Sequence, residues 1–254
     1  MILYLGVFLV GILIGFLGGL FGKGGSAVAT PMLSLIGIPG FVAVAAPLPA
    51  TIPGLAIASA EYWRSRLIDW QIVRWSIAAG IPATILGSYL TNFTGSTPLL
   101  VVTGMLVLSS GLAFLLAPQE QRNGEDTGAG GVVRPAFWRL RLVLVATGVG
   151  LVSGLLANSG GFLLAPAYAR ILRQPLKAAF ASSLAVSMVL AVPGTLIHAW
   201  LGHIDWIVTV VLAAGSVPFS WLGARTALRS RPARLERVYG IALVILGVLM
   251  FFHL

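Results

Sequence analysis

Two glycine-rich stretches hold the residues best able to bind a ligand. "FGKGGS" at 21–26 places Lys23 between glycines, directly after an uncharged apolar run, and "ANSGGF" at 157–162 places Asn158 and Ser159 in a similar setting. Glycine permits backbone conformations that leave N–H groups unpaired, and a helix that follows directs the positive end of its dipole at them. Cationic, amide and hydroxyl donors beside such a helix end suit an anion. We therefore predict an anion site built from backbone as well as side chains.

The predicted binding residues come from both glycine stretches and from the third helix of each half of the chain. In this prediction Lys23 and the glycine N–H groups neutralise the anion, and the hydroxyl and amide groups orient it. Two alternatives stay open: the small residues could serve close helix packing alone, and Lys23 could extend its ammonium group to a cytoplasmic helix end. The predicted residues are Lys23, Gly24, Gly25, Ser26, Thr51, Asn158, Ser159, Gly160, Gly161, Ser182, Ser183 and Ser187.

The chemistry of an enzyme is missing from the sequence. There are no paired carboxylates, no metal-ligand spacing, no nucleophile beside a base and no cysteine, and "FGKGGS" lacks the spacing of a nucleotide-binding loop. We expect no catalytic residue, no metal ligand and no cofactor. No acidic residue lies within an apolar run, and we predict that Asp69 and Asp205 are N-caps of the segments that begin at Trp70 and Trp206.

Long apolar segments must position the binding residues. The surroundings of these segments must be lipid. The chain is 58% hydrophobic and 9% charged, with a mean hydropathy of +0.98. Its formal net charge of +9 is carried by short loops, which is a topology signal rather than a sign of nucleic-acid binding. Eight runs have near membrane-spanning length: 2–21, 41–60, 72–91, 99–117, 140–157, 176–200, 207–227 and 238–254.

The chain contains an internal repeat. "GGLFGKGGSAVATP" at 18–31 aligns with "SGLLANSGGFLLAP" at 153–166, and "LIDW" at 67–70 aligns with "HIDW" at 203–206. We predict an N-terminal transmembrane repeat (1–117), a polar cytoplasmic linker (118–138) and a C-terminal transmembrane repeat (139–254). Pro47 and its counterpart Ser183 predict an irregular turn at the same depth in both halves.

Loop charges indicate that the two repeats are inverted. The loop with Arg64 and Arg66 is basic, whereas its equivalent "LGHIDW" at 201–206 carries no Lys or Arg; conversely, 225–237 holds several arginines and "TNFTGSTP" at 91–98 none. Because basic loops face the cytoplasm, equivalent loops lie on opposite sides of the membrane.

The predicted fold is an all-α polytopic membrane protein of the bacterial inner membrane, with both termini periplasmic. Each repeat has about five hydrophobic segments, giving eight full spans and two short or re-entrant segments at 25–37 and 160–172.

The motifs resemble those of the sulfite exporter TauE/SafE family along nearly the whole chain except the linker. The similar stretches are "GKGGSAVATP" at 22–31, "ANSGGFLLAP" at 157–166, "IPATILG" at 81–87 and "AFASSLAVSMVLAVPGTLIHAWLGHIDW" at 179–206. The resemblance implies secondary transport of small, often sulfur-containing anions such as sulfite, sulfoacetate or other organosulfonates, usually outward. The sequence departs from the family pattern at Lys23, commonly apolar, and at "APLPAT" (46–51), where a more Ser/Thr-rich turn is usual.

The leading hypothesis is an alternating-access exporter of a small anion, with membrane lipid as its other partner and no nucleic acid. The alternative is a non-transporting membrane scaffold or assembly protein whose glycine motifs serve helix packing. The sequence leaves the particular anion, the direction, the coupling ion and the oligomeric state open.

Overall fold

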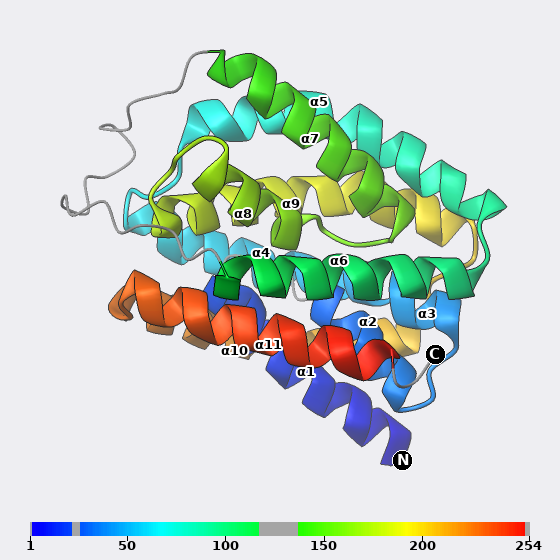
Figure 1. The fold of residues 1–254 in the computed structure, drawn as a ribbon. Coiled ribbons are helices and arrows are strands. Elements are labelled where there is room, and N and C mark those ends of the chain that lie inside the picture. Colours follow the sequence, from blue (N-terminus) through cyan, green and yellow to red (C-terminus); the bar gives the residue numbers. More distant parts are fainter. Residues whose placement is uncertain (1, 22–25, 117–136, 252–254) are drawn as a thin grey trace.

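A computed structural model describes residues 2–21, 26–116 and 137–251 (Figure 1). Lys23, Gly24, Gly25 and residues 118–136 of the predicted linker lie outside the described residues. The described residues are helical, as predicted. Their helices are α1 (Ile2–Phe21), α2 (Ser26–Leu35), α3 (Gly40–Ala45), α4 (Pro47–Arg64), α5 (Trp70–Leu90), the 3-10 helix η1 (Thr91–Phe93), α6 (Ser96–Leu116), α7 (Trp138–Leu155), α8 (Gly161–Arg170), α9 (Leu176–Trp200), α10 (Trp206–Arg229) and α11 (Pro232–Phe251).

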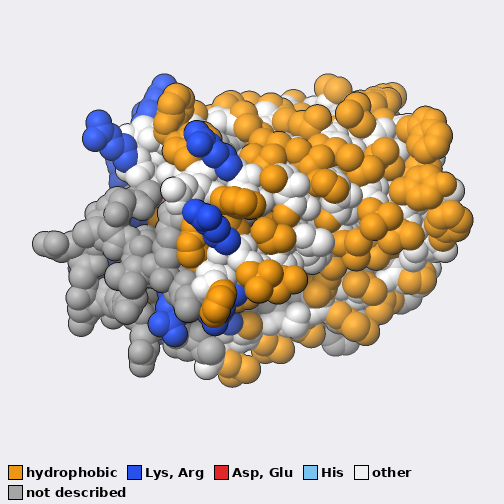
Figure 2. All heavy atoms as spheres, turned by 90° about the horizontal axis from the view of Figure 1, so that it is seen from above, with side chains coloured by type: hydrophobic (Ala, Val, Ile, Leu, Met, Phe, Trp, Pro, Cys, Tyr) orange, Lys and Arg blue, Asp and Glu red, His pale blue; other side chains and the backbone are white. Residues whose placement is uncertain are grey.

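The long helices form a multi-pass membrane protein. In the described part of the chain, five segments are long and apolar enough to cross a membrane: α1, Gly40–Arg64, α7, α9 and α10. The helices α5 and α6 contain 21 residues each and α11 contains 20, so each is about 30 Å long at 1.5 Å per residue. Hydrophobic side chains cover the lateral surface in Figure 2, and lysines and arginines gather at one end.

Two short helices occupy the positions of the predicted short segments. The helices α2 and α8 have 10 residues each, about 15 Å, which is half of a bilayer core about 30 Å thick. A Cβ built on Gly160, just before α8, would lie 2.4 Å from Ser153 Oγ and 3.2 Å from Val149 Cγ1 on α7. The start of α8 therefore lies alongside α7 and not beyond its end at Leu155.

Glycines let two helix pairs pack backbone against backbone. A Cβ on Gly19 of α1 would lie 2.0 Å from the Ser220 carbonyl oxygen of α10, and a Cβ on Gly154 of α7 would lie 2.1 Å from the Thr84 carbonyl oxygen of α5. No larger residue fits at either position without moving a helix. Close packing is therefore the role of these two glycines, which the sequence left open.

The helices α4 and α9 pack against each other, and they also pack on α10 and α5, respectively. The irregular turn predicted in both halves is present in one. The helix α3 ends at Ala45 and α4 begins at Pro47, which lacks an N–H donor, whereas α9 runs from Leu176 to Trp200 without interruption. The prediction at Ser183 was wrong, because its hydroxyl donates to the Phe180 carbonyl (2.9 Å) within a continuous helix.

The two aspartates cap their helices as predicted. Asp69 accepts hydrogen bonds from the N–H groups of Gln71 (3.0 Å) and Ile72 (3.3 Å) at the start of α5. Asp205 makes the equivalent bonds at the start of α10, at 2.9 and 3.1 Å. Both carboxylates are thereby committed to backbone groups at helix N-termini.

Candidate functional site

The connection between α7 and α8 is a tight turn with left-handed backbone at two positions. Ala157 has φ 45° and Gly160 has φ 72°. The Asn158 N–H donates to the Ser153 carbonyl (2.8 Å), and the Asn158 side-chain oxygen Oδ1 accepts from the Gly160 N–H (2.7 Å). Left-handed backbone at a residue with a side chain costs about 1–3 kcal/mol and tends to occur where function requires it. The turn starts α8 at Gly161 in the interior of the protein.

Buried hydrogen-bond donors without acceptors surround the start of α8. No side chain caps this helix. Asn158 is 3% exposed, and its amide nitrogen Nδ2 has no partner among the described residues. Ser153 is fully buried, and its hydroxyl likewise has no partner there. Each unsatisfied buried donor costs about 1–3 kcal/mol. A ligand with several acceptor oxygens would satisfy these donors and the partial positive charge of the helix end together.

Four of the predicted binding residues meet in this turn: Asn158, Ser159, Gly160 and Gly161. Ser159 is fully buried, and Gly161 is the first residue of α8. The structure thus places the predicted residues of the second glycine stretch in one buried turn. Ser26 begins α2, but its side chain lies outside the described residues, as do Lys23, Gly24 and Gly25.

The three predicted serines of α9 differ in what they contact. Ser182 Oγ accepts from the backbone N–H of Asp69 (3.0 Å), so it joins α9 to the start of α5. Ser183 donates to its own helix, as described above. Ser187 is fully buried, and its hydroxyl has no partner in the described part of the protein. Ser187 is therefore the member of this group best able to bind a ligand.

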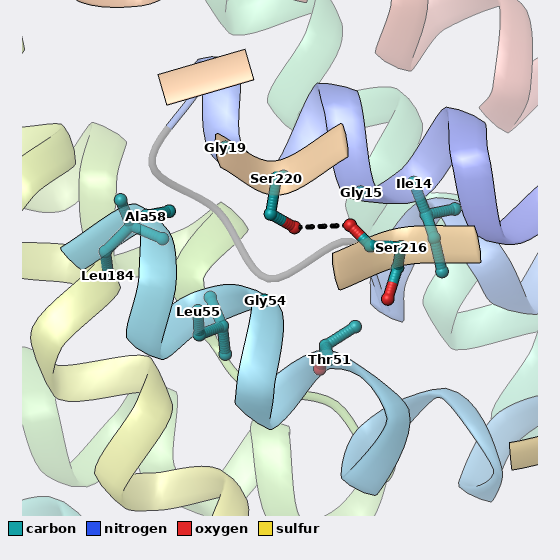
Figure 3. A pocket seen from close by; sticks show the side chains of 11 residues that line it. Ile14, Gly15, Gly19, Thr51, Gly54, Leu55, Ala58, Leu184, Ser216 and Ser220 are labelled. Carbon is teal, nitrogen blue, oxygen red and sulfur yellow. Dashed lines mark hydrogen bonds between the residues drawn. The ribbon is translucent and has the colours of Figure 1, made fainter. Parts of the chain in front are cut away.

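Thr51 lines a small, partly open pocket between α1, α4, α9 and α10, with room for about one water molecule (Figure 3). Across it from α4, α10 places Ser216 and Ser220. The Thr51 hydroxyl donates to the Leu48 carbonyl (3.0 Å), and the Ser220 hydroxyl donates to the Ser216 carbonyl (2.9 Å), the bond drawn in Figure 3. These protons are already committed to the helices. This pocket has little free space, and neither hydroxyl offers the free proton that an anion needs.

The sequence reasoning missed five described residues whose buried hydroxyl groups have no partner: Ser59, Thr84, Ser88, Ser153 and Thr195. Three of them, Ser153, Thr84 and Ser88, lie beside the turn before α8 or on α5, which packs against α7. Each of these three is at most 1% exposed, and no described residue bonds to its hydroxyl. Ser153 aligns with Gly18 in the repeat, so a search for matched polar residues passes over it. Thr84 and Ser88 are one helical turn apart in "ATILGS" at 83–88, a spacing that would have placed both hydroxyls on one face.

Comparisons with known proteins place the chain in a family. Residues 7–250 match the family described as Sulfite exporter TauE/SafE. The chain is 28% identical over 247 residues to a "Probable membrane transporter protein" of Xylella fastidiosa (strain 9a5c), covering 93% of this chain and 90% of that protein. It is 23% identical over 250 residues to the "Probable membrane transporter protein YjnA" of Bacillus subtilis (strain 168), covering 95% and 97%.

A further relative is longer. The "Probable membrane transporter protein MamO" of Magnetospirillum gryphiswaldense is 26% identical over 221 residues, which cover 74% of this chain and 35% of that protein. No solved structure matches the chain. The match over nearly its whole length, together with the polytopic helical fold, shows that the chain belongs to the sulfite exporter TauE/SafE family and is a membrane transporter, not an enzyme.

Proposed function

We propose that this transporter moves a small sulfur-containing anion, such as sulfite, sulfoacetate or another organosulfonate, outward across the bacterial inner membrane. One observation carries the proposal: α8 starts without a side-chain cap beside two buried, unpartnered donors, Asn158 Nδ2 and Ser153 Oγ. A sulfite or sulfonate group presents acceptor oxygens on several sides, which matches converging donors. The name of the matched family supports a sulfur-containing substrate.

We further propose that the site lies between two inverted repeats, 1–117 and 139–254, and that transport proceeds by alternating access. Equivalent residues make equivalent contacts in the two halves. The Tyr62 hydroxyl donates to the Gly19 carbonyl (3.3 Å), and His198 Nε2 bonds the Gly154 carbonyl (3.0 Å). Tyr62 and His198 lie near the C-terminal ends of α4 and α9, which finish at opposite ends of the molecule (Figure 1). This opposition is what inversion requires.

The distribution of charge supports the predicted orientation. Lysines and arginines gather at the end where α6 finishes and α7 begins, and both termini lie at the opposite end (Figures 1 and 2). Basic ends of membrane proteins face the cytoplasm. In this orientation the linker 118–138 is cytoplasmic, both termini are periplasmic, and the cytoplasmic face attracts anions toward the transporter.

A ligand screen followed by a flux assay tests the proposal. The purified protein is heated with sulfite, thiosulfate, sulfoacetate, taurine or sulfate, and the anion that raises the melting temperature is then used, radiolabelled, in proteoliposomes. We expect at least one sulfur-containing anion to stabilise the protein and to cross the membrane faster than in protein-free vesicles. If no anion stabilises the protein and none crosses faster, the proposed function is wrong, and the scaffold alternative becomes the better account.

A further inference from the structure

We infer that the anion leaves the start of α8 along a seam between α5, α7 and α9, lined by the hydroxyl groups of Ser153, Thr84 and Ser88. We call this the outer seam. The inference rests on the proposed function, and it identifies the outward part of the route and the groups that hold the anion there.

Two glycines place the α5 hydroxyls where three helices meet. A Cβ on Gly194 of α9 would lie 3.6 Å from Thr84 Cγ2 and 3.7 Å from Ser88 Oγ. A Cβ on Gly154 of α7 would lie 2.7 Å from the Ser88 nitrogen. Thr84 and Ser88 of α5 therefore lie against both α9 and α7. Ser153, next to Gly154, contacts the turn before α8, so the seam is continuous with the proposed binding site.

The hydroxyl groups of the outer seam are unusual for serine and threonine in helices. Such hydroxyls ordinarily donate to the carbonyl of the preceding turn, as Thr103 does to Leu99 (2.8 Å). In the outer seam, Ser153, Thr84 and Ser88 are buried without such a bond to any described residue. Their donor capacity is left for a guest that accepts hydrogen bonds, as the oxygens of the proposed anion do.

The corresponding surface in the other half does not offer the same groups. Ser220 of α10 occupies the position equivalent to Thr84, and its hydroxyl donates to the Ser216 carbonyl (2.9 Å). Position 224, equivalent to Ser88, is alanine. The repeat therefore supplies two similar seams, but free hydroxyl donors line the one beside Gly154. That residue is next to the end of α7, on the side where the chain termini lie, so the seam leads outward (Figure 1).

The absence of cysteine from the chain permits a direct test. Ser88→Cys is reconstituted with the termini facing the reagent and treated with two membrane-impermeant methanethiosulfonates, one carrying a sulfonate and one a trimethylammonium group. Asn92→Cys, in the exposed helix η1 at the same end, gives the reference ratio of the two rates. We expect the ratio of the sulfonate rate to the trimethylammonium rate to be about tenfold higher at position 88 than at position 92, a difference of about 1.4 kcal/mol. We also expect the transported anion to slow the labelling at position 88.

The inference would be overturned if the two reagents showed the same rate ratio at positions 88 and 92, or if the transported anion did not affect the labelling. Either result would leave the proposed function intact. A second pair of variants covers misfolding of the cysteine variant. Thr84→Val removes the hydroxyl at nearly constant shape, and Thr84→Ser restores it. We expect flux to fall about five- to tenfold in the valine variant and to recover in the serine variant. Unchanged flux in both variants, or equal loss in both, refutes the route. Absence of flux in the wild type instead refutes the proposed function.

Discussion

At the residue scale, Asn158 uses one end of its amide for the fold and leaves the other for a ligand. Its Oδ1 fixes the turn by accepting from the Gly160 N–H, and its Nδ2 has no described partner. One atom of this side chain therefore holds the turn, and the other remains able to bind a ligand. A substitution that keeps the Oδ1 acceptor and replaces the Nδ2 donor therefore tests binding while leaving the hydrogen bond of the turn in place.

Asn158→Asp is that substitution. A carboxylate keeps the acceptor for the Gly160 N–H but replaces the donor with a negatively charged oxygen that repels an anion. We expect the anion-induced rise in melting temperature to disappear and flux to fall at least about tenfold. Because burying a carboxylate also lowers the stability of the ligand-free protein, the rise in melting temperature is measured as the difference between samples of the same variant with and without the anion. Thr103→Val is the control, because it deletes a buried hydroxyl of α6 that lies outside the proposed site. A fully active Asn158→Asp variant would remove Asn158 from the site.

His203 predicts a pH dependence at the end of the protein where α9 finishes and α10 begins. It lies in the loop between α9 and α10, stacks on Phe41 (4.7 Å between centroids) and places its Nδ1 3.2 Å from Nδ1 of His198. Because the Gly154 carbonyl accepts from His198 Nε2, the neutral His198 ring accepts at Nδ1 and His203 donates. Partial burial lowers the pKa of His203 below its ordinary 6.5.

A lowered histidine pKa means that the unfolded chain binds the proton more readily than the folded one. The contribution of neutral His203 to the free energy of unfolding is therefore fully present above pH 6.5 and is lost as the pH falls below that value. His203→Phe keeps the ring stack on Phe41 and removes the titration. We expect the melting temperature of this variant to fall less than that of the wild type between pH 7 and pH 5. Parallel curves for the two proteins would show that His203 does not contribute to acid sensitivity.

At the element scale, backbone contact between α5 and α7 depends on glycine. The space at Gly154 is closed by the Thr84 carbonyl oxygen of α5, whereas a Cβ on Gly148 of the same helix meets nothing within 4 Å. Substitution at Gly154 therefore tests close packing, and the same substitution at Gly148 measures the effect of helix propensity alone.

We expect Gly154→Ala to destabilise the protein by about 2 kcal/mol or more, because the added methyl group forces the two helices apart. Gly148→Ala should be neutral or stabilise it by up to about 1 kcal/mol, through the higher helix propensity of alanine. Unfolding in mixed micelles by added denaturing detergent measures both. Equal effects at the two glycines would contradict the close packing of α5 on α7.

At the scale of the whole molecule, charge and chain ends are segregated. Lysines and arginines gather at one end of the face that Figure 2 shows, and α1 begins and α11 finishes at the other end (Figure 1). Positive charge resists translocation, so the basic end sets the orientation during insertion. The apolar lateral surface between the two ends is the surface that meets lipid.

This segregation predicts the outcome of reporter fusions. Green fluorescent protein inserted within 118–138 should fluoresce, because the linker is expected in the cytoplasm, where this reporter folds. Alkaline phosphatase fused at the C-terminus should be active, because it matures in the periplasm. The reverse pattern for both reporters would invert the proposed orientation. A mixed pattern would show that the two ends of the C-terminal repeat lie on the same side of the membrane, which contradicts inverted repeats.

The elements of this protein could largely be predicted from its sequence, because they depend on local properties. The lengths of apolar runs predicted the long helices, and glycine-rich interruptions predicted the short helices α2 and α8. Asp69 and Asp205 were recognisable as N-caps because a cap is defined by residue type and position. The structure confirms both caps, at the starts of α5 and α10.

The tertiary structure decided which residues of the right type remain able to bind. Ser182 contacts the backbone of another helix, Ser183 bonds within its own helix, and Ser187 is left without a described partner, although all three lie in one short stretch. Likewise Gly154 serves helix packing and Gly160 the turn that starts α8. Residue type fixes what a side chain or a bare backbone can do, and only the neighbours brought by the fold determine whether that capacity is already used.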